Sequence, residues 1–320
     1  MSFSSEVKKE LLSVAVRDRH CQLAEIAAMI SGCGRIFIED GRMHVALITE
    51  NSQVAQRYAG LVQQAGDITV SITRAHPMQQ KIKMAYAADL AEEEAVRKLF
   101  QMLRMIGSDG QMRKNITLTD GLLLQKSCCK RAFLRGAFLT AGSMSNPKKS
   151  YHFEIVCGSQ EKAAQLQEQF ACFQLEAKTV IRKNHAVLYF KEGAQIVDAL
   201  NIMGAHMALM DLENVRIIKE MRNDINRRVN CETANINKTV HAAYRQQEAI
   251  RFLQKQGALQ GLPQQLQEMA QLRVENPQAT IRELSELCNP PVGRSGVNHR
   301  LRRLEEIAEQ MGYGIRDDQS

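Results

Sequence analysis

The stretch from Arg294 to Arg303 contains arginine, serine, asparagine and histidine but no acidic residue. These side chains suit DNA, because arginine can hydrogen-bond guanine through two donors, asparagine can pair with adenine, and serine at a helix N-terminus can bind phosphate. Acidic residues begin again only at Glu305 and Glu306. The segment therefore has residue types for both backbone affinity and base readout. A solvated basic helix face is the alternative.

Hydrophobic spacing assigns these side chains to the faces of one helix. Apolar residues recur at helical intervals and predict a buried stripe at Val297, Leu301, Leu304, Ala308 and Met311. The 3.6-residue period puts Ser295, His299, Arg302 and Arg303 opposite that stripe, with Asn298 and Arg300 on its flanks. The candidate DNA-binding residues are Arg294, Ser295, Asn298, His299, Arg300, Arg302 and Arg303. Their arginines can serve phosphate more than bases.

Two more helices and a turn precede this basic helix. Residues 264–274 predict a first helix, and Thr280 with Glu283 forms a capping-box pattern at the start of a second. The buried face expected for the second helix consists of Ile281, Leu284 and Leu287. The proline-rich residues 289–293 cannot continue a helix, and Ser295 offers a side-chain cap to the third. This series predicts a helix-turn-helix that inserts its third helix into the major groove.

The sulfur and imidazole side chains show no ligand pattern along the chain. None of the eight cysteines forms a C-x-x-C pair, and the histidines have no metal-ligand spacing with one another or with the cysteines. No glycine-rich nucleotide cradle occurs either. We therefore expect reduced, mostly buried thiols, no metal and no cofactor.

Length and charge bound the class of protein. The 320 residues predict two globular parts, and a formal charge of +7 with a pI near 9.0 favours polyanionic partners. Residues 1–14 lack the features of a secretory signal, and no apolar run approaches a membrane span of roughly 18 residues. We expect a cytoplasmic, nucleoid-associated protein with no membrane partner.

Residues 1–205 predict an α+β domain built from two αββαββα repeats. The first repeat has helices near 20–31, 51–65 and 91–105, with strands at 35–38, 43–49, 68–73 and 81–87. The second has helices near 128–140, 160–173 and 193–203, with strands at 151–157, 177–182 and 186–190. Residues 206–258 predict a helical linker, and residues 259–320 an all-α helix-turn-helix domain.

The best-matched pieces of the two repeats are residues 26–34 and 134–142, each a small-residue helix that ends at glycine, as a C-cap does. Their small side chains would let two helices pack closely across a pseudo-two-fold axis, and these are Ala27, Ala28, Gly32, Gly136, Ala137 and Ala141. An ordinary pair of small-residue helices is the alternative.

Three stretches resemble the WhiA family of bacterial regulators associated with sporulation and cell division: residues 3–11, 226–235 and 290–301. The resemblance implies a LAGLIDADG homing-endonuclease fold in two repeats, tethered to a helix-turn-helix similar to that of primary sigma factors. In the nucleases, an acidic residue near the end of each repeat helix holds the catalytic metal. The degenerate catalytic positions here are Cys33 and Ala141, which offer no hard oxygen ligand, so we expect no cleavage and no enzyme.

The expected function is therefore a transcription regulator that binds double-stranded promoter DNA, with another transcription regulator or RNA polymerase as a further candidate partner. The linker residues that match the family could contact phosphate or hold the two domains together: Asn226, Arg227, Asn230, Asn235 and Lys238. Strand-borne basic residues could give the first domain its own DNA contact: Arg74, Lys81, Lys83, Arg182, Lys183 and Lys191. A surviving endonuclease and a cell-division protein that binds partners, with incidental DNA affinity, are the alternatives.

Overall fold

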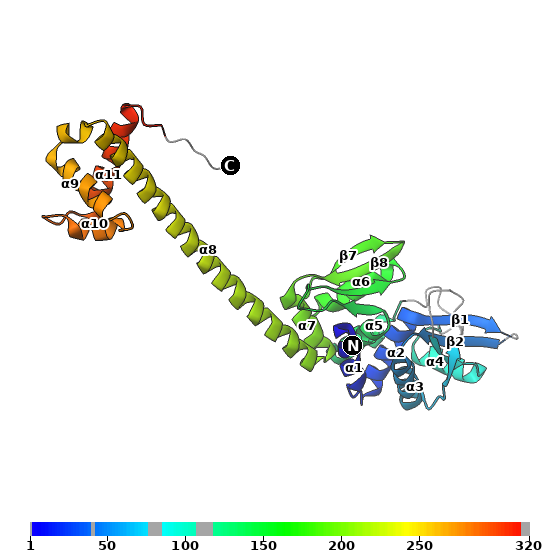
Figure 1. Cartoon of the computed structure of the whole chain (residues 1–320). Coiled ribbons are helices and arrows are strands. Elements are labelled where there is room, and N and C mark those ends of the chain that lie inside the picture. The colour runs from blue at the N-terminus through cyan, green and yellow to red at the C-terminus, as the bar shows by residue number, and fades with distance from the viewer. Residues whose placement is uncertain (1, 40–41, 76–84, 107–117, 315–320) are drawn as a thin grey trace. The chain divides into compact units, whose positions relative to one another are not determined.

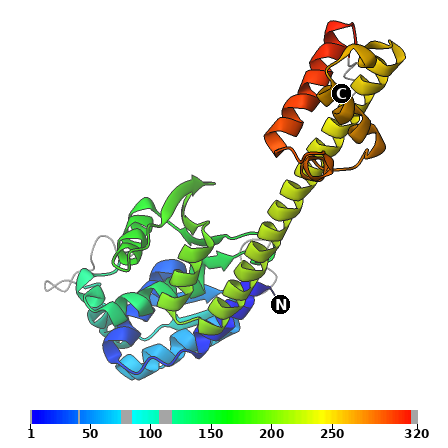
Figure 2. The ribbon, with the colours of Figure 1, turned by 90° about the vertical axis from the view of Figure 1, so that its left-hand side faces the viewer.

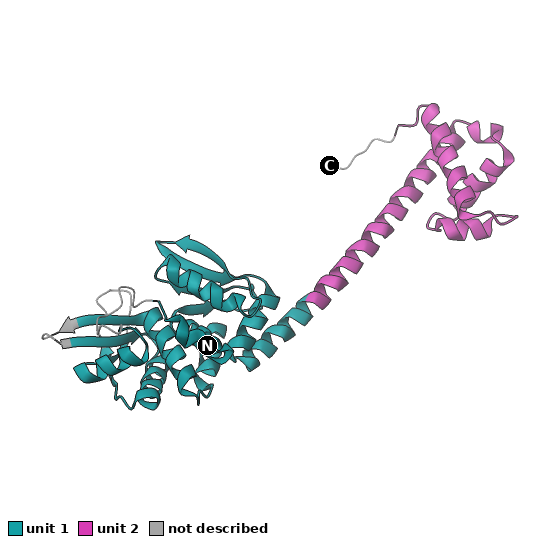
Figure 3. Ribbon diagram, turned by 180° about the vertical axis from the view of Figure 1, so that it is seen from behind, with its two compact units in different colours: residues 1–219 teal, residues 220–320 magenta. Residues whose placement is uncertain are grey.

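A computed structural model describes residues 2–39, 42–75, 85–106 and 118–314. The chain divides into two compact units, residues 1–219 and 220–320, which Figure 3 shows in different colours. The division falls inside one long helix, α8 (His206–Lys255). The first unit contains two apolar cores, and the second unit contains a third.

The first unit contains the predicted repeat twice (Figure 1). The first copy comprises α2 (Arg19–Cys33), β1 (Gly34–Glu39), β2 (Arg42–Thr49), α3 (Ser52–Gly66), β3 (Ser71–Ala75), β4 (Ala85–Leu90) and α4 (Glu93–Met102). The second comprises α5 (Ser127–Ala141), β5 (Gly142–Met144), β6 (Phe153–Cys157), α6 (Gln160–Ala171), β7 (Lys178–Arg182), β8 (His185–Phe190) and α7 (Gly193–Met203). The short strand β5 was not predicted, and it completes the αββαββα order of the second copy.

The two sheets share one topology, which confirms that the unit is a repeat. Both are antiparallel, with strand orders β1-β2-β4-β3 and β5-β6-β8-β7. Each copy buries its own set of aliphatic and aromatic side chains. Helix α1 (Phe3–Ser13) precedes the first copy, yet Phe3, Val7 and Leu11 are buried in the core of the second.

Helices α2 and α5 pack against each other at very close range. A Cβ on Gly136 would lie 2.7 Å from the carbonyl oxygen of Glu25, and a Cβ on Gly32 would collide with the side chain of Thr140. At Gly136 only glycine fits without a shift of the neighbouring helix backbone, and at Gly32 a larger residue would have to displace the Thr140 side chain. The prediction that small residues allow a close helix pair is confirmed.

The glycines that end this helix pair act differently from the prediction. Gly34 and Gly142 do follow the last helical residues, but their φ angles of −73° and −85° are extended rather than left-handed. A Cβ on Gly34 would lie 2.5 Å from the carbonyl oxygen of Ile30, and one on Gly142 would lie 2.7 Å from that of Phe138. Glycine is therefore needed here because a side chain has no room beside the last helical turn, and not because the backbone is left-handed.

A buried carboxylate joins the two copies across the helix pair. Glu25 is fully buried and accepts hydrogen bonds from Arg57 Nε and Arg135 Nε, each at 2.9 Å. Arg135 also donates to the carbonyl of Met203 at 2.9 Å, and Arg57 donates to that of Leu12 at 3.2 Å. The network pairs the Glu25 carboxylate with two guanidinium groups in a low-dielectric interior, where an unpaired ion would be costly.

The second unit packs three helices around the end of α8 (Figure 2). These are α9 (Gln264–Glu275), α10 (Ile281–Leu287) and α11 (Arg294–Gln310), with the 3₁₀ turn η2 (Ala258–Gly261) before them. Ala249, Ile250 and Leu253 of α8 are buried in this core. The last turns of the segment predicted as linker therefore belong to the C-terminal fold, although the whole segment 206–255 is helical as predicted.

The capping box of α10 is confirmed. Thr280 accepts a hydrogen bond from the backbone N–H of Glu283, whose side chain accepts one from the N–H of Thr280 at 2.7 Å. These hydrogen bonds lower the pKa of the Glu283 carboxyl. The predicted inner face needs one correction: Leu284 is buried, but Leu287 is 50% exposed at the last helical position, and Cys288 takes the buried place.

Candidate nucleic-acid interface

Helix α11 has the predicted two faces. Val297, Leu301, Leu304 and Ala308 are buried against the C-terminal core. Met311, the predicted fifth member of the stripe, is exposed because the helix ends at Gln310 and Met311 is its C-cap residue. The inner stripe thus fixes how the rest of the helix faces solvent.

The predicted DNA-binding residues all lie on α11. Six of the seven are exposed, namely Arg294, Ser295, Asn298, His299, Arg302 and Arg303. Arg300 differs, because it is half-buried and its guanidinium donates to Gln265 Oε1 at 3.3 Å. The arrangement gathers hydrogen-bonding and cationic groups on the N-terminal half of a single helix, which is the half that enters the major groove in helix-turn-helix proteins.

The predicted cap of α11 is wrong. The helix begins at Arg294, so Ser295 lies within its first turn, and the N-cap residue is Gly293, which has no side chain to accept a hydrogen bond. A cap needs the extended backbone of the residue before the helix, and Gly293 has that conformation with φ −60° and ψ 154°. The first-turn N–H groups therefore have no side-chain cap, and a phosphate could accept from them.

An intramolecular acid neutralises part of the basic face. Glu306 lies 3.0 Å from Arg303 Nη1 and 3.6 Å from Arg302 Nε. These three side chains are between two-fifths and four-fifths exposed, so each ion pair contributes little to stability. Ion pairs this exposed give way to a competing anion at small cost.

The linker candidates lie on one stretch of α8. Asn226, Arg227, Asn230, Asn235 and Lys238 are all exposed. Their exposure leaves them open to a phosphate or to a protein surface.

The degenerate catalytic positions end the two repeat helices. Cys33 is the last residue of α2, and Ala141 is the last residue of α5. A cavity of about 920 Å³ lies beside Cys33, and among the described residues that line it only Glu50 carries a carboxylate. Burial raises the pKa of the Cys33 thiol to about 12, and burial also lowers the pKa of Lys8 across the cavity. A protonated thiol and a lysine are poor surroundings for magnesium.

Two of the strand-borne basic residues already have partners within the first unit. Arg74, Arg182, Lys183 and Lys191 are exposed, whereas Lys81 and Lys83 lie outside the described residues. Arg182 lies 3.6 Å from Glu154, and the ammonium of Lys191 lies 5.4 Å from the centre of the Tyr189 ring. Part of this charge is therefore already paired within the unit.

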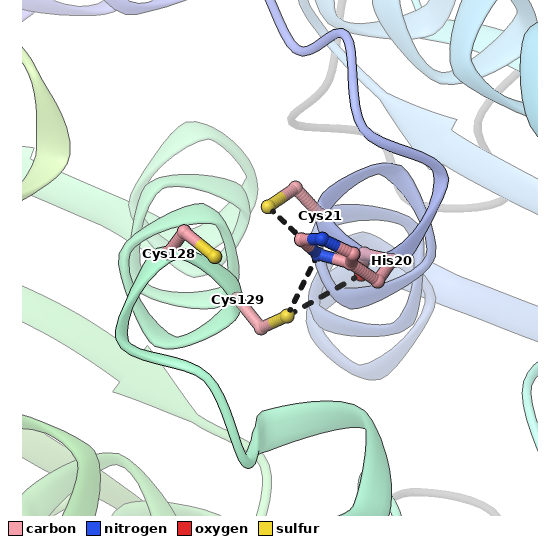
Figure 4. Close-up of side chains that lie close together, drawn as sticks. All are labelled: His20, Cys21, Cys128 and Cys129. Atoms are coloured by element: carbon pink, nitrogen blue, oxygen red, sulfur yellow. Dashed lines mark hydrogen bonds between the residues drawn. The ribbon is translucent and has the colours of Figure 1, made fainter.

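One cluster was missed by sequence reasoning. His20, Cys21, Cys128 and Cys129 come together where α2 and α5 begin (Figure 4). His20 Nδ1 lies 3.2 Å from both Cys21 Sγ and Cys129 Sγ. Burial and the neighbouring thiols raise the pKa of Cys21 to about 12. The separation of 107 residues between the two adjacent pairs explains why spacing along the chain gave no signal.

No helix in the described part of the chain is long and apolar enough to cross a membrane.

The fold and this surface define a class of protein: a LAGLIDADG-like α+β domain followed by a helical helix-turn-helix region. Family models described as the WhiA N-terminal LAGLIDADG-like domain, the WhiA LAGLIDADG-like domain and the WhiA C-terminal HTH domain match residues 19–106, 130–222 and 225–308. The chain belongs to the WhiA family.

Named relatives cover the whole length. The chain is 46% identical to "Probable cell division protein WhiA" of Lachnoclostridium phytofermentans, over 97% of this chain and 99% of the relative. It is 43% identical to the protein of the same name from Alkaliphilus oremlandii, over 98% and 99%. The crystal structure of full-length DUF199/WhiA from Thermatoga maritima matches with a TM-score of 0.59 at 24% identity, covering 98% of this chain and 100% of that one. That likeness shows the fold.

Proposed function

We propose that this protein is a DNA-binding transcription regulator in cell division or sporulation and that it has no nuclease activity. The observation that carries the proposal is the exposed face of α11. Basic and hydrogen-bonding side chains lie on this face, and the opposite face is a buried apolar stripe. Its relatives named as probable cell division proteins support the cellular process. Promoter DNA is the proposed partner, with another transcription regulator or RNA polymerase as a protein partner.

The position of each residue on α11 favours either base contact or phosphate contact. Asn298, His299 and Arg302 lie on the exposed face and can reach base edges, whereas Arg294 and Ser295 at the helix start suit phosphate. Arg300 holds Gln265 of α9 and serves the packing of the three helices as well as charge. Mutation of the first group should therefore change sequence preference, and mutation of the second should weaken binding to all sequences alike.

The direct test is genome-wide chromatin immunoprecipitation of the full chain and of the double variant Arg302→Ala/Arg303→Ala. We expect sharp promoter peaks that the double variant loses. The matched control is Arg251→Ala/Lys255→Ala, which removes the same charge from exposed positions of α8 in the same unit. Peaks that survive the α11 variant, or that vanish equally in the control, would contradict recognition by α11.

Point variants are preferable to truncation for this experiment. Removal of everything after residue 258 would uncover Ile250 and Leu253, which are buried in the C-terminal core. Newly exposed apolar surface could itself cause loss of binding through aggregation. The double variant keeps that core intact.

The absence of nuclease activity is proposed from the chemistry of the helix ends. Cys33 and Ala141 supply no carboxylate where a pair would be needed to hold a divalent ion. Supercoiled plasmid incubated with the protein and Mg²⁺ or Mn²⁺ should remain uncut. Specific cleavage that Glu50→Gln abolishes would overturn this part of the proposal, since Glu50 is the carboxylate that lines the adjacent cavity.

A second candidate function, the binding of a protein partner with incidental DNA affinity, is favoured by the exposed apolar side chains of α8. They include Ile218, Met221, Ile225, Val229, Ile236 and Val240. Under this alternative, DNA affinity would vanish near physiological salt with no preference among sequences, because binding driven by phosphate alone behaves so. A salt titration with promoter and scrambled DNA separates the two functions.

A further inference from the structure

The first turns of α2 and α5 carry four side chains that can bind a soft metal ion. Each helix has 15 residues, and each contributes its second and third: His20 and Cys21 from α2, Cys128 and Cys129 from α5. The two adjacent pairs are therefore equivalent positions of the two repeats. The cluster lies at the opposite ends of the helices from Cys33 and Ala141, about 20 Å of helical rise away.

The separations between the side chains approach those of a metal centre. The ligand atoms of all four residues lie within 4.8 Å of one another, and His20 Nδ1 lies 3.2 Å from two of the sulfurs. In a tetrahedral zinc site, Zn–S bonds of about 2.3 Å and Zn–N bonds of about 2.0 Å place neighbouring ligand atoms roughly 3.5–3.8 Å apart. Small rotations of the side chains would bring the four atoms to those separations.

Two helix N-termini and a lysine near the cluster offset part of the cost of an anionic metal–thiolate group. Three thiolates with one divalent cation carry a net charge of −1, and the positive ends of two helix dipoles meet at this point. Lys126 is the N-cap residue of α5, directly before the cluster. Because a bound cation stabilises thiolates, its binding would release the three thiol protons to solvent.

An ion can reach the cluster. Cys21 and Cys129 are buried and His20 is half-buried, but Cys128 is exposed. Cys21 and Cys128 also line a cavity of about 310 Å³. The buried members shield a bound ion from water, and the exposed member provides an entry path.

We propose that His20, Cys21, Cys128 and Cys129 form a Cys₃His site for Zn²⁺ that ties the two repeats together at the starts of their central helices. Three sulfur ligands and one imidazole select a soft or borderline cation, and the group contains no carboxylate that would favour magnesium or calcium. A structural role fits because four protein ligands leave no open position for a substrate. The proposal departs from the expectation of no metal, which rested on spacing along the chain alone.

The test uses the reduced full-length protein and the metal itself. Zinc content is measured by plasma mass spectrometry after dialysis against a weak chelator, and Co²⁺ substitution is followed by the absorption bands of tetrahedral thiolate coordination. We expect one ion per chain and sulfur-to-cobalt charge-transfer bands. Zinc should also raise the thermal midpoint of the protein, since a ligand that binds only the native state stabilises it.

Variants distinguish this site from adventitious binding. Cys128→Ser removes the exposed ligand with little risk to folding and should weaken zinc binding by more than the 10- to 100-fold that loss of an outer-shell partner costs. Cys21→Ser tests a buried ligand in the same way. The control is Cys172→Ser/Cys231→Ser, which removes two exposed cysteines outside the cluster and should keep one ion per chain.

Three results would overturn the proposal. One is reduced wild-type protein that retains no zinc, and another is Cys128→Ser protein that binds zinc as tightly as wild type. The third is a disulfide between Cys21 and either Cys128 or Cys129, found by peptide mass spectrometry of cell lysates whose free thiols are alkylated and to which no reductant is added. That bond would show that the cluster is a redox pair rather than a metal site.

Discussion

At the scale of single residues, Glu306 is the acidic side chain that pairs with two of the proposed DNA-binding arginines. This carboxylate pairs with Arg302 and Arg303, and under the proposed function DNA phosphate would displace it from both. Glu306→Gln should therefore strengthen DNA binding about two- to fivefold, because exposed ion pairs are each worth less than about 1 kcal/mol. Fluorescence anisotropy with promoter DNA at fixed salt measures the change.

The control for Glu306 is Glu309→Gln on the same helix. Glu309 is exposed and makes no ion pair with any residue that the structure describes, so its replacement changes net charge equally without freeing an arginine. Equal gains in affinity from both variants would mean that net charge alone is responsible. No gain from Glu306→Gln would remove it as a competitor of phosphate.

Glu25 is the residue on which the repeat interface depends. Glu25→Gln would leave the guanidinium groups of Arg57 and Arg135 without their shared carboxylate in a buried place. Breaking such a buried network costs about 3–5 kcal/mol of unfolding free energy. Urea unfolding of the variant measures the loss, with exposed Glu176→Gln as the control. A loss below about 1 kcal/mol would show that water enters to solvate the arginines.

At the scale of elements, the capping box stabilises the start of α10, the helix that precedes α11. Thr280→Ala removes the acceptor for the Glu283 N–H and should cost about 1 kcal/mol in the stability of the C-terminal unit. The test is the thermal midpoint of a C-terminal fragment, with Thr280→Ser as the conservative variant that keeps the cap. If Thr280→Ser were as destabilising as Thr280→Ala, methyl packing rather than capping would be the reason.

The predicted helix starts agree with the structure where side chains near the boundary mark it. Thr280 with Glu283 marked the start of α10, and α9 begins at Gln264 as predicted. Helix α11 begins two residues earlier than a Ser295 cap requires, because the chain after Val292 can already turn into a helix at Arg294. Strand β5 was missed because a pairing of three residues, Gly142–Met144, carries no alternating pattern of its own.

At the scale of the whole molecule, the division into units predicts which fragments fold. A fragment of residues 240–314 contains the α8 side chains Ala249, Ile250 and Leu253 that are buried in the C-terminal core, whereas one of residues 259–314 does not. Each fully buried aliphatic side chain contributes about 1.5–3 kcal/mol, so the shorter fragment should be largely unfolded. Circular dichroism melts of both fragments test this, and a cooperative transition in the shorter one would contradict it.

The sequence by itself determined what depends on residues close along the chain. The stripe Val297, Leu301 and Leu304, the opposing basic face and, apart from β5, the order of helices and strands in the two repeats are all local patterns, and hydrophobic period reports them directly. The absence of carboxylates at Cys33 and Ala141 could also be seen in the sequence. The resemblance to the family was visible in the same sequence.

Only the tertiary structure decided which distant side chains meet. The ion pair of Glu25 with Arg135 and the cluster of His20 with three cysteines depend on how α2 and α5 pack. No local period encodes a contact between residues more than 100 positions apart, because such a contact forms only when both repeats have folded and their helices have met. Spacing along the chain therefore gave no sign of the cluster to which each repeat contributes two side chains.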